Sequence, residues 1–236
     1  MDKYPDYRSV YGGKVVASLM TKRVPFSKKS ILLLVLLMTI LLSCKIATIR
    51  SLEEDKEAKA GFNPNQYVES IWDSQLIPTF HEQAIEITDL LGQIDANQNK
   101  AIQDHGHRSG TGAYSFMTYG EAKVLAYAVD LRIGTLSLDF APFDGTTDAT
   151  MLVGPLIPRR NDAVRDAVGF IKFNDFVNQT EFAEVSNALK NHVLQNVVTV
   201  VDPDTITGKT VSFYGAFTLV DRSEIEIVPV TIEIQE

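Results

Sequence analysis

Apolar side chains recur at the spacing of amphipathic helices in the stretch that follows residue 62. Asn63-Pro64 is a typical helix start, because an Asn side chain caps free backbone amides and proline fits the first helical turn. We expect the helix to break near Ile77, since Pro78 lacks the N–H that a continuous helix needs. A second helix is predicted from Pro78 to about Gln103, with a stripe of apolar positions at Phe80, Ala84, Ile87, Leu91 and Ile94.

From residue 114 the pattern changes to the alternation that is typical of β-strands. The predicted strands are Tyr114–Val129, Gly134–Phe140, Thr150–Ile157, Lys209–Val220 and Glu224–Glu236. Gly120 and Gly215 lie inside two of them and predict bulges or sharp bends. In the last strand the apolar phase moves from odd to even positions at Val228-Pro229, which predicts a bulge there.

A helix is predicted between the third and fourth strands. It begins with Asn178 and Glu181, which resemble a capping box, and its apolar face is Phe182, Val185, Leu189, Val193 and Val197. A shorter helix, 163–168, is predicted just before it, with Asp162 as its N-cap. The order of elements predicts an α+β fold, in which an N-terminal helical layer packs on a small OB-like, partly open β-barrel. An open sheet with the helices on one face is the alternative.

The most apolar stretch of the chain lies near its N-terminus, Lys28–Cys44, KKSILLLVLLMTILLSC. Two lysines precede the apolar run Ile31–Leu42, which is shorter than the roughly 20 residues of a membrane-spanning helix, so the layout is typical of a secretory signal. Leu41-Leu42-Ser43-Cys44 resembles the lipobox of bacterial lipoproteins. The resemblance implies that Cys44 is lipidated and holds the protein on the extracytoplasmic, periplasmic side of a membrane. A buried free cysteine at the end of an uncleaved signal anchor is the alternative.

The signal divides the chain into predicted segments. Residues 1–43 form the signal region, and because residues 1–19 are polar and mixed, we expect translation to start at Met20. Residues 44–61 form a lipid-anchored tether, since Ser51–Lys59 has too few apolar side chains to bury itself. Residues 62–236 form a single α+β domain, with helices in 62–105 and the β-barrel in 106–236.

Charge narrows the classes of function. The chain has 22 basic and 30 acidic residues; residues 1–43 hold 7 and 2 of these, so the remainder carries a net charge of −13. An acidic chain outside the cytoplasm is a poor candidate for nucleic-acid binding, because phosphate contacts need a basic face. We therefore expect no nucleic-acid partner, and contact with the membrane through the lipid on Cys44.

Side chains that form bidentate hydrogen bonds concentrate in the stretch Phe170–Glu181. Beside Phe173 and Phe176 lie four of them, Asn174, Asp175, Asn178 and Gln179. Such groups next to aromatic faces suit a sugar or amide ligand, so the stretch predicts a ligand-binding site. The alternative is that caps and turns use the same side chains.

Three other polar groups have weaker chemical interpretations. His105 and His107 could ligate zinc or copper, but only Asp104 is near them in sequence, and a solvated loop is favoured. The segment 144–148 could hold calcium but lacks the ligand set of an EF-hand loop, so a hairpin turn is favoured. The densest basic patch could receive an anion or form a solvated face; it consists of Arg159, Arg160 and Arg165. We predict no metal and no cofactor.

Familiar catalytic motifs are missing from the sequence after residue 44. It contains no Gly-x-Ser-x-Gly, no His-Glu-x-x-His and no cysteine. We therefore expect that the protein is not an enzyme and has no catalytic residues. The alternative is an active site whose catalytic groups are scattered along the sequence.

Several stretches resemble a bacterial family of predicted periplasmic lipoproteins, the DUF2291 family. They are YVESIWDSQLIPTF, GTGAYSF, FIKFNDFVNQTEFAEVSNAL and GKTVSFYGAFTL, and the resemblance runs from about Phe62 to the C-terminus. It implies export and, for many members, a genomic link to sugar-type ABC importers. Our first hypothesis is an anchored accessory of such an importer that binds a small sugar-like ligand. The alternative is an envelope module for protein–protein interaction without a small ligand.

Overall fold

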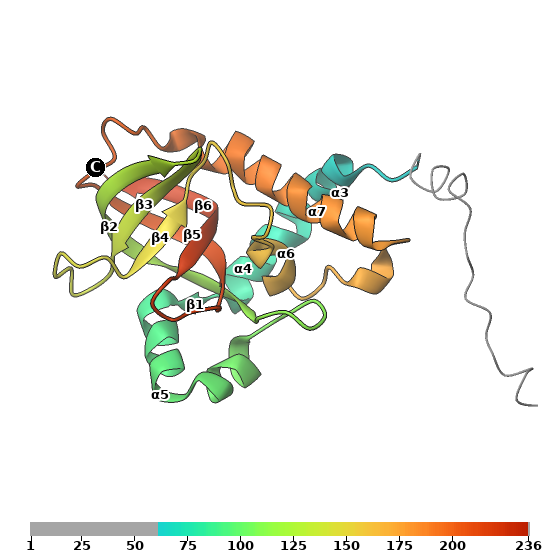
Figure 1. Ribbon diagram of the computed structural model, residues 1–236, viewed down its shortest axis with the longest axis horizontal. Helices are drawn as coiled ribbons and strands as arrows, with labels where there is room; N and C mark the ends of the chain where they lie inside the picture. Colours follow the sequence, from blue (N-terminus) through green and yellow to red (C-terminus); the bar gives the residue numbers. More distant parts are fainter. Residues whose placement is uncertain (1–60, 236) are drawn as a thin grey trace, which may run out of the picture. The chain divides into compact units, whose positions relative to one another are not determined.

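The computed structural model describes residues 61–235 (Figure 1). The signal region, Cys44, the expected start at Met20 and the tether up to residue 60 lie outside the described residues. Within 61–235, no helix combines the length and the apolar character that crossing a membrane requires.

The domain begins with a helix whose hydrogen-bonding pattern changes before a proline. α3 (Pro64–Ile71) has the predicted cap, since Asn63 Oδ1 accepts hydrogen bonds from two backbone amides of the first turn. The π-helical turn η1 (Trp72–Leu76) follows, and α4 (Ile77–Gln83) continues from it. The predicted interruption near Ile77 is confirmed, and it takes the form of a wider turn, because Pro78 has no N–H to donate.

The predicted second helix, from Pro78 to Gln103, is wrong because two extended residues divide it. Ala84 leaves the helical conformation, with φ −66° and ψ 142°. β1 (Ile85–Glu86) then pairs in parallel with Thr118 and Tyr119, near the start of a long strand, where Thr118 Oγ1 also donates a hydrogen bond to the Ile85 carbonyl (2.8 Å). Pairing with a distant strand therefore overrides the local helical periodicity.

α5 (Ile87–His105) starts directly after this short strand. The carboxylate of Glu86 caps it by accepting a hydrogen bond from the backbone N–H of Asp89 (2.9 Å). Four apolar side chains near its start are buried, and three of them belong to the predicted stripe: Ile87, Leu90, Leu91 and Ile94. The periodicity was thus correct for the packing face, but not for the continuity of the helix.

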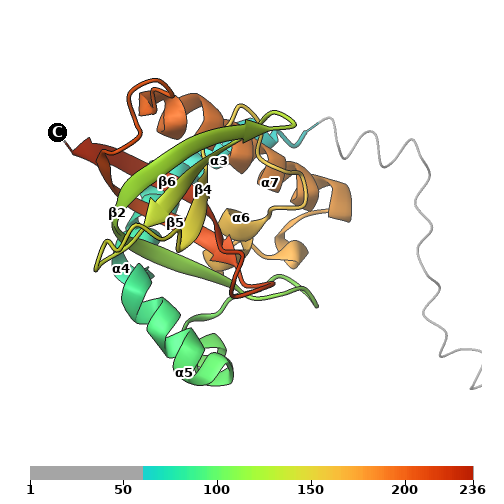
Figure 2. The same ribbon diagram turned by 60° about the vertical axis from the view of Figure 1, so that its left-hand side comes forward.

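Five strands form a ring (Figures 1 and 2). In spatial order they are β2 (Ser115–Asp130), β3 (Ile133–Asp139), β4 (Ala149–Leu152), β6 (Glu226–Gln235) and β5 (Thr210–Thr218). β5 pairs back onto β2, whereas β4 and β6 share only a short parallel pairing, so the ring is partly open. This is the predicted OB-like barrel, and the alternative of an open sheet is wrong.

The strand details confirm one prediction and correct two others. The register of β2 is regular through Gly120 and shifts instead at Leu125, so the bulge predicted at Gly120 is wrong. In β6 the extra residue is Val230, directly after Val228-Pro229, so the bulge predicted there is confirmed, and it lies opposite Gly215. β4 is shorter than the predicted strand 150–157, because Gly154 adopts a left-handed φ of 87°.

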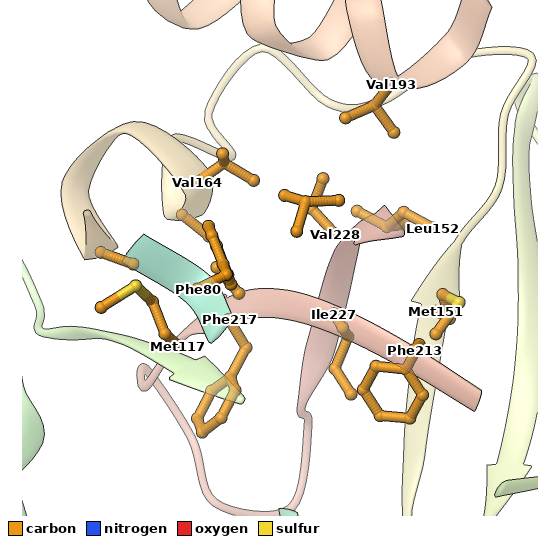
Figure 3. Close-up of a cluster of buried hydrophobic side chains, with 14 of the residues drawn as sticks. Phe80, Met117, Met151, Leu152, Val164, Val193, Phe213, Phe217, Ile227 and Val228 are labelled. Carbon is orange, nitrogen blue, oxygen red and sulfur yellow. The ribbon is translucent and has the colours of Figure 1, made fainter. Parts of the chain in front are cut away.

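The helices between β4 and β5 cover the barrel on the side where α3 lies. They are α6 (Ala163–Ala167), η2 (Phe173–Asp175), α7 (Gln179–His192), η3 (Val193–Val197) and η4 (Val198–Val200). α7 packs against α3, and α6 packs against β2 and β5. Figure 3 shows side chains of the helical elements, among them Val164 and Val193, close to barrel residues such as Phe217 and Val228. One core therefore joins the barrel and the helical layer.

Candidate functional site

A cleft of about 740 Å³ lies on the outer face of β2, β5 and β6. Side chains from α4, from the start of α5 and from the β3–β4 loop also line it. We call it the outer-face cleft, and its aromatic and charged lining includes His81, Glu86, Tyr119, Glu121, Tyr214 and Glu233. Its size lies within the range of sites for small molecules.

The strand register builds the floor of the cleft as two rows, each with one residue from β2, β5 and β6. The first row is Tyr119, Tyr214 and Thr231. The second row is Glu121, Ser212 and Glu233. These positions alternate with buried residues of the barrel interior, so their side chains point outward. The two tyrosine rings stack, with centroids 5.3 Å apart and an angle of 27° between the ring planes.

The helical side of the cleft depends on a close approach at Gly120. A Cβ at this position would lie 2.7 Å from Ile87 Cγ2 and 3.3 Å from Glu86 Oε1. Glycine therefore allows the start of α5 to sit directly on β2, beside the two rows. On the same side His81 packs its ring against Tyr214, with centroids 4.6 Å apart.

The β3–β4 loop contributes an aromatic residue in an unfavourable backbone conformation. Phe143 has a φ of 60°, and its side chain lines the cleft and is 46% exposed. A non-glycine residue is held in the left-handed region only when its surroundings determine it, and such residues occur preferentially at functional sites. Two hydrogen bonds from the backbone to carboxylates hold the conformation of this loop. The N–H of Gly145 donates to Asp139 (2.9 Å), and the N–H of Phe140 donates to Asp148 (2.7 Å).

The segment 144–148 is the second half of the connection between β3 and β4, which bends at Gly145. Asp144 accepts a hydrogen bond from the N–H of Thr146 (2.8 Å), and this bond lowers the pKa of its carboxyl. Asp148 is bonded to the backbone as well. Two carboxylates of the segment therefore stabilise the hairpin connection.

Three carboxylates face the cleft with few partners in the protein. Glu86 accepts its hydrogen bonds through Oε2, and Glu121 accepts one from Gln235 Nε2 (2.7 Å). Glu233 accepts none from residues 61–235. Among the described residues that line the cleft there is no lysine or arginine. The cleft is therefore an acidic pocket with an aromatic floor.

The four residues predicted to bind a ligand lie elsewhere, at the start of α7. Asn178 Oδ1 caps α7 by accepting from the N–H groups of Thr180 and Glu181, and Asp175 Oδ2 accepts from the N–H of Lys172 (3.2 Å). Asn174 and Gln179 are exposed. None of the four lines the outer-face cleft.

The predicted basic patch is divided by the fold. Arg165 is buried, donates to Asp162 (3.1 Å) and Asp166 (2.8 Å), and lies over the ring of Phe182. Asp162 occupies the N-cap position of α6, but it makes no capping hydrogen bond, which corrects that prediction. Arg159 and Arg160 are exposed.

Asp162 instead connects α6 to α7. Its carboxylate accepts hydrogen bonds from Ser186 and from Lys190, whose Nζ is 3.4 Å away. Lys190 also donates to the backbone carbonyls of Arg159 (2.9 Å) and Asn161 (3.1 Å). Burial lowers the pKa of Lys190, and the Asp162 carboxylate opposes this change. The charged groups of this network are therefore bonded to other groups of the domain.

The two histidines of the loop are held by different contacts. His105 ends α5 and its Nε2 lies 3.0 Å from Gln93 Oε1. His107 pairs through its backbone with Ser115, and its ring lies next to Gly169. Within residues 61–235 no three His, Cys, Asp or Glu side chains gather as metal ligands would.

Sequence reasoning missed the cleft because its residues are spread over α4, β1, α5, β2, β5, β6 and the β3–β4 loop. The signal was present as pairs of polar or aromatic residues at outward positions of three strands: Tyr119 with Glu121, Ser212 with Tyr214, and Thr231 with Glu233. Only the cross-strand register shows that these pairs are neighbours.

Comparison with known proteins agrees with the fold. A family model described as "Predicted periplasmic lipoprotein (DUF2291)" matches residues 34–233, which include Cys44. The structure is similar to the crystal structure of an OB-fold protein from Thermotoga maritima, with a TM-score of 0.58 and 17% sequence identity. The alignment covers 74% of this chain and 99% of that chain, and at this identity the likeness shows the fold alone. No curated protein matches the sequence.

Proposed function

The chain belongs to the DUF2291 family of predicted periplasmic lipoproteins, and we propose that it binds a small molecule in the outer-face cleft. As a lipoprotein it is attached to a membrane. The observation that carries the proposal is the pair of outward rows on β2, β5 and β6, which places stacked tyrosines next to carboxylates in a cavity of about 740 Å³. We assign it binding without catalysis.

Two features support a binding site over an ordinary surface depression. Its floor is built on paired strands, which hold side chains more rigidly than loops do. Its rim includes Phe143, whose left-handed backbone costs on the order of 1–3 kcal/mol and leaves an aromatic side chain in the cleft. Together they form a preorganised surface of aromatic faces and hydrogen-bond acceptors.

Ligand-induced stabilisation tests the proposal. The thermal midpoint of the full-length protein in detergent is measured with sugars, amino acids, nucleosides and amines. A compound that binds only the folded state stabilises it by about 2.7 kcal/mol at a hundredfold excess over its dissociation constant. We expect one chemical class to raise the midpoint, and no change with any class would contradict a small-molecule function.

Variants locate the ligand. Tyr214→Ala removes the ring that contacts both Tyr119 and His81, so it should abolish the midpoint shift. A double variant, Asn174→Ala with Gln179→Ala, removes the two exposed amides of the predicted site at the start of α7. We expect it to keep the shift; loss of the shift in this variant, with retention in Tyr214→Ala, would move the ligand to that site.

We also propose that the protein is an accessory of a sugar-type ABC importer. Support comes from the family resemblance and from the combination of a membrane anchor with a cleft for a small solute. Anchoring keeps a binding domain at high effective concentration near a transporter in the same membrane. Affinity purification from membranes should recover importer subunits with this protein, and equal recovery with an unrelated lipoprotein would contradict the link.

A protein–protein interaction module is the second candidate, and the β2–β3 hairpin tip favours it. Leu131 and Arg132 both have positive φ (47° and 71°), and Leu131 is 83% exposed. Such turns usually contain Asn or Gly, so an exposed leucine there has an energetic cost and no packing benefit within the domain. Photocrosslinking from position 131 in cells tests the candidate, and a crosslink to one defined envelope protein would support it.

A further inference from the structure

We infer that the ligand of the outer-face cleft is a small organic cation, a protonated or quaternary amine. This inference rests on the proposed binding function and specifies the chemistry of its ligand. It depends on the cavity, on its aromatic floor and on the distribution of charge around it.

The carboxylates surround one volume from two directions. Glu121 and Glu233 flank Ser212 in the second row, on strands two steps apart, which separates their backbones by about 10 Å at the usual strand spacing. Glu86, in the short strand β1 before α5, lines the same cavity from the helical side. A compact cation between them would be within reach of more than one carboxylate.

The aromatic floor suits the same ligand. Tyr119 and Tyr214 stack side by side in the first row, next to the row of the two glutamates. An ammonium group is attracted to the face of a tyrosine ring, and recognition of quaternary amines by aromatic cages uses this attraction. The side chains of Phe143 and Ile77 add apolar surface for the rest of the ligand.

No lysine or arginine among the described lining residues compensates the acidic groups of the cleft. The basic side chain that lines the cleft is His81, and it packs against Tyr214. Lys123 lies on the same face of β2, one row beyond Glu121, but it does not line the cleft and forms no ion pair within residues 61–235. A neutral sugar would leave the three carboxylates of the cavity without a positive charge, whereas a cation supplies one.

Matched pairs of probes test the charge of the ligand directly. Full-length protein in detergent is titrated calorimetrically with choline and its neutral carbon isostere 3,3-dimethylbutanol, with putrescine and butanediol, and with glucosamine and glucose. We expect a cationic member to bind at least about tenfold more tightly than its neutral partner. Its binding should weaken as salt is added, because ions screen the attraction.

Isosteric variants separate charge from shape. Glu121→Gln and Glu233→Gln should each weaken binding of the preferred cation by roughly tenfold, because each removes a charged acceptor. The matched control is Glu184→Gln, which removes an exposed acid of α7 outside the cleft and should change affinity by less than about twofold.

The outcomes distinguish this inference from the function on which it rests. Equal binding of the charged and neutral members of a pair, or binding unaffected by both glutamine variants, overturns the cation and keeps a small-molecule function. A response only to neutral sugars in the thermal panel has the same meaning. If no compound in the panel or the pairs binds, both the cation and the binding function are wrong.

Discussion

Two groups of charged side chains in this domain are arranged in opposite ways. Between α6 and α7, the buried cations Arg165 and Lys190 are bonded to Asp162, Asp166 and backbone carbonyls. In the outer-face cleft, three glutamates share one cavity without a lysine or arginine among its described lining residues. The charges of the first group are compensated inside the protein, so removing one partner would leave a buried charge unpaired and destabilise the fold. The glutamates of the second group have carboxylate oxygens that can accept hydrogen bonds from a ligand.

The comparison shows why residue type alone is a weak guide to function. Arg165 belonged to a basic patch that could receive an anion or form a solvated face, yet its side chain is buried and bonded to Asp162 and Asp166. Glu121 and Glu233 were ordinary outward positions of predicted strands, yet the barrel brings them to one cavity. Whether a charge is already paired is decided by contacts between distant segments.

The largest expected effect comes from breaking the buried group. Arg165→Met leaves the Asp166 carboxylate without a cation and Asp162 with Lys190 alone, so the free energy of unfolding should fall by about 3–5 kcal/mol. Urea denaturation measures it. Arg160→Met is the control, because its contact with Glu226 is exposed and long (3.9 Å), and it should change stability by no more than about 0.5 kcal/mol. Equal effects of the two variants would contradict a structural role for the buried group.

A smaller effect is expected where α5 meets the floor of the cleft. Gly120→Ala places a methyl group 2.7 Å from Ile87 Cγ2, and relieving this clash should cost about 1–3 kcal/mol of stability. Gly92→Ala in α5 is the matched control: its Cβ meets nothing within 4 Å, and alanine should stabilise the helix by about 0.5–1 kcal/mol. Thermal melts of both variants should therefore shift in opposite directions, and two shifts of the same sign would refute the close-approach argument.

The pH dependence of stability provides a second test of the buried group, through its Asp166 carboxyl. Burial raises the pKa of the Asp166 carboxyl above its ordinary value of 3.8, although Arg165 opposes this. Between 3.8 and the raised pKa the folded state binds more protons than the unfolded state, so the contribution of Asp166 to stability falls as pH rises through this window. The Asp166→Asn variant has no titratable group at this position, so it lacks this pH dependence.

The difference in unfolding free energy between Asp166→Asn and the wild type should thus move in favour of the variant as pH rises from 3.8 through this window. Urea midpoints at a series of pH values measure it. A difference that is constant with pH would show that the carboxyl titrates alike in the folded and unfolded states.

The smallest effect is expected in the cleft. Glu233→Gln should change stability by less than about 0.5 kcal/mol, in the direction of greater stability, because it removes like-charge repulsion. Asp95→Asn is the contrasting control, since it loses an exposed bidentate pair with Arg222 (2.8 and 2.9 Å) and should destabilise by about 0.2–1 kcal/mol. Chemical denaturation at low salt compares them, and a clear loss in Glu233→Gln would mean that the fold depends on this glutamate.

Local patterns in the sequence were sufficient for most of the fold. Alternation identified the strands, Asn63 and Asn178 marked helix starts, and the order of elements indicated an OB-like barrel. The pattern failed between Pro78 and Gln103, where helical spacing continues through Ile85 although this residue pairs with β2. Gly120 likewise serves the approach of α5 and not a bulge. Both failures arise because the deciding contact comes from a segment far away in sequence.

The sequence by itself determined the lipoprotein signal, the family and the type of barrel, because these depend on short motifs and on periodicities that each segment carries alone. Which polar residues are free to bind a ligand depends on the tertiary structure. Asp175 and Asn178 bond to nearby backbone, Arg165 and Lys190 are compensated within a buried network, and the residues of the cleft meet only through strand register. A binding surface is a property of side chains brought together from separate strands and helices, and their positions are set when the barrel forms.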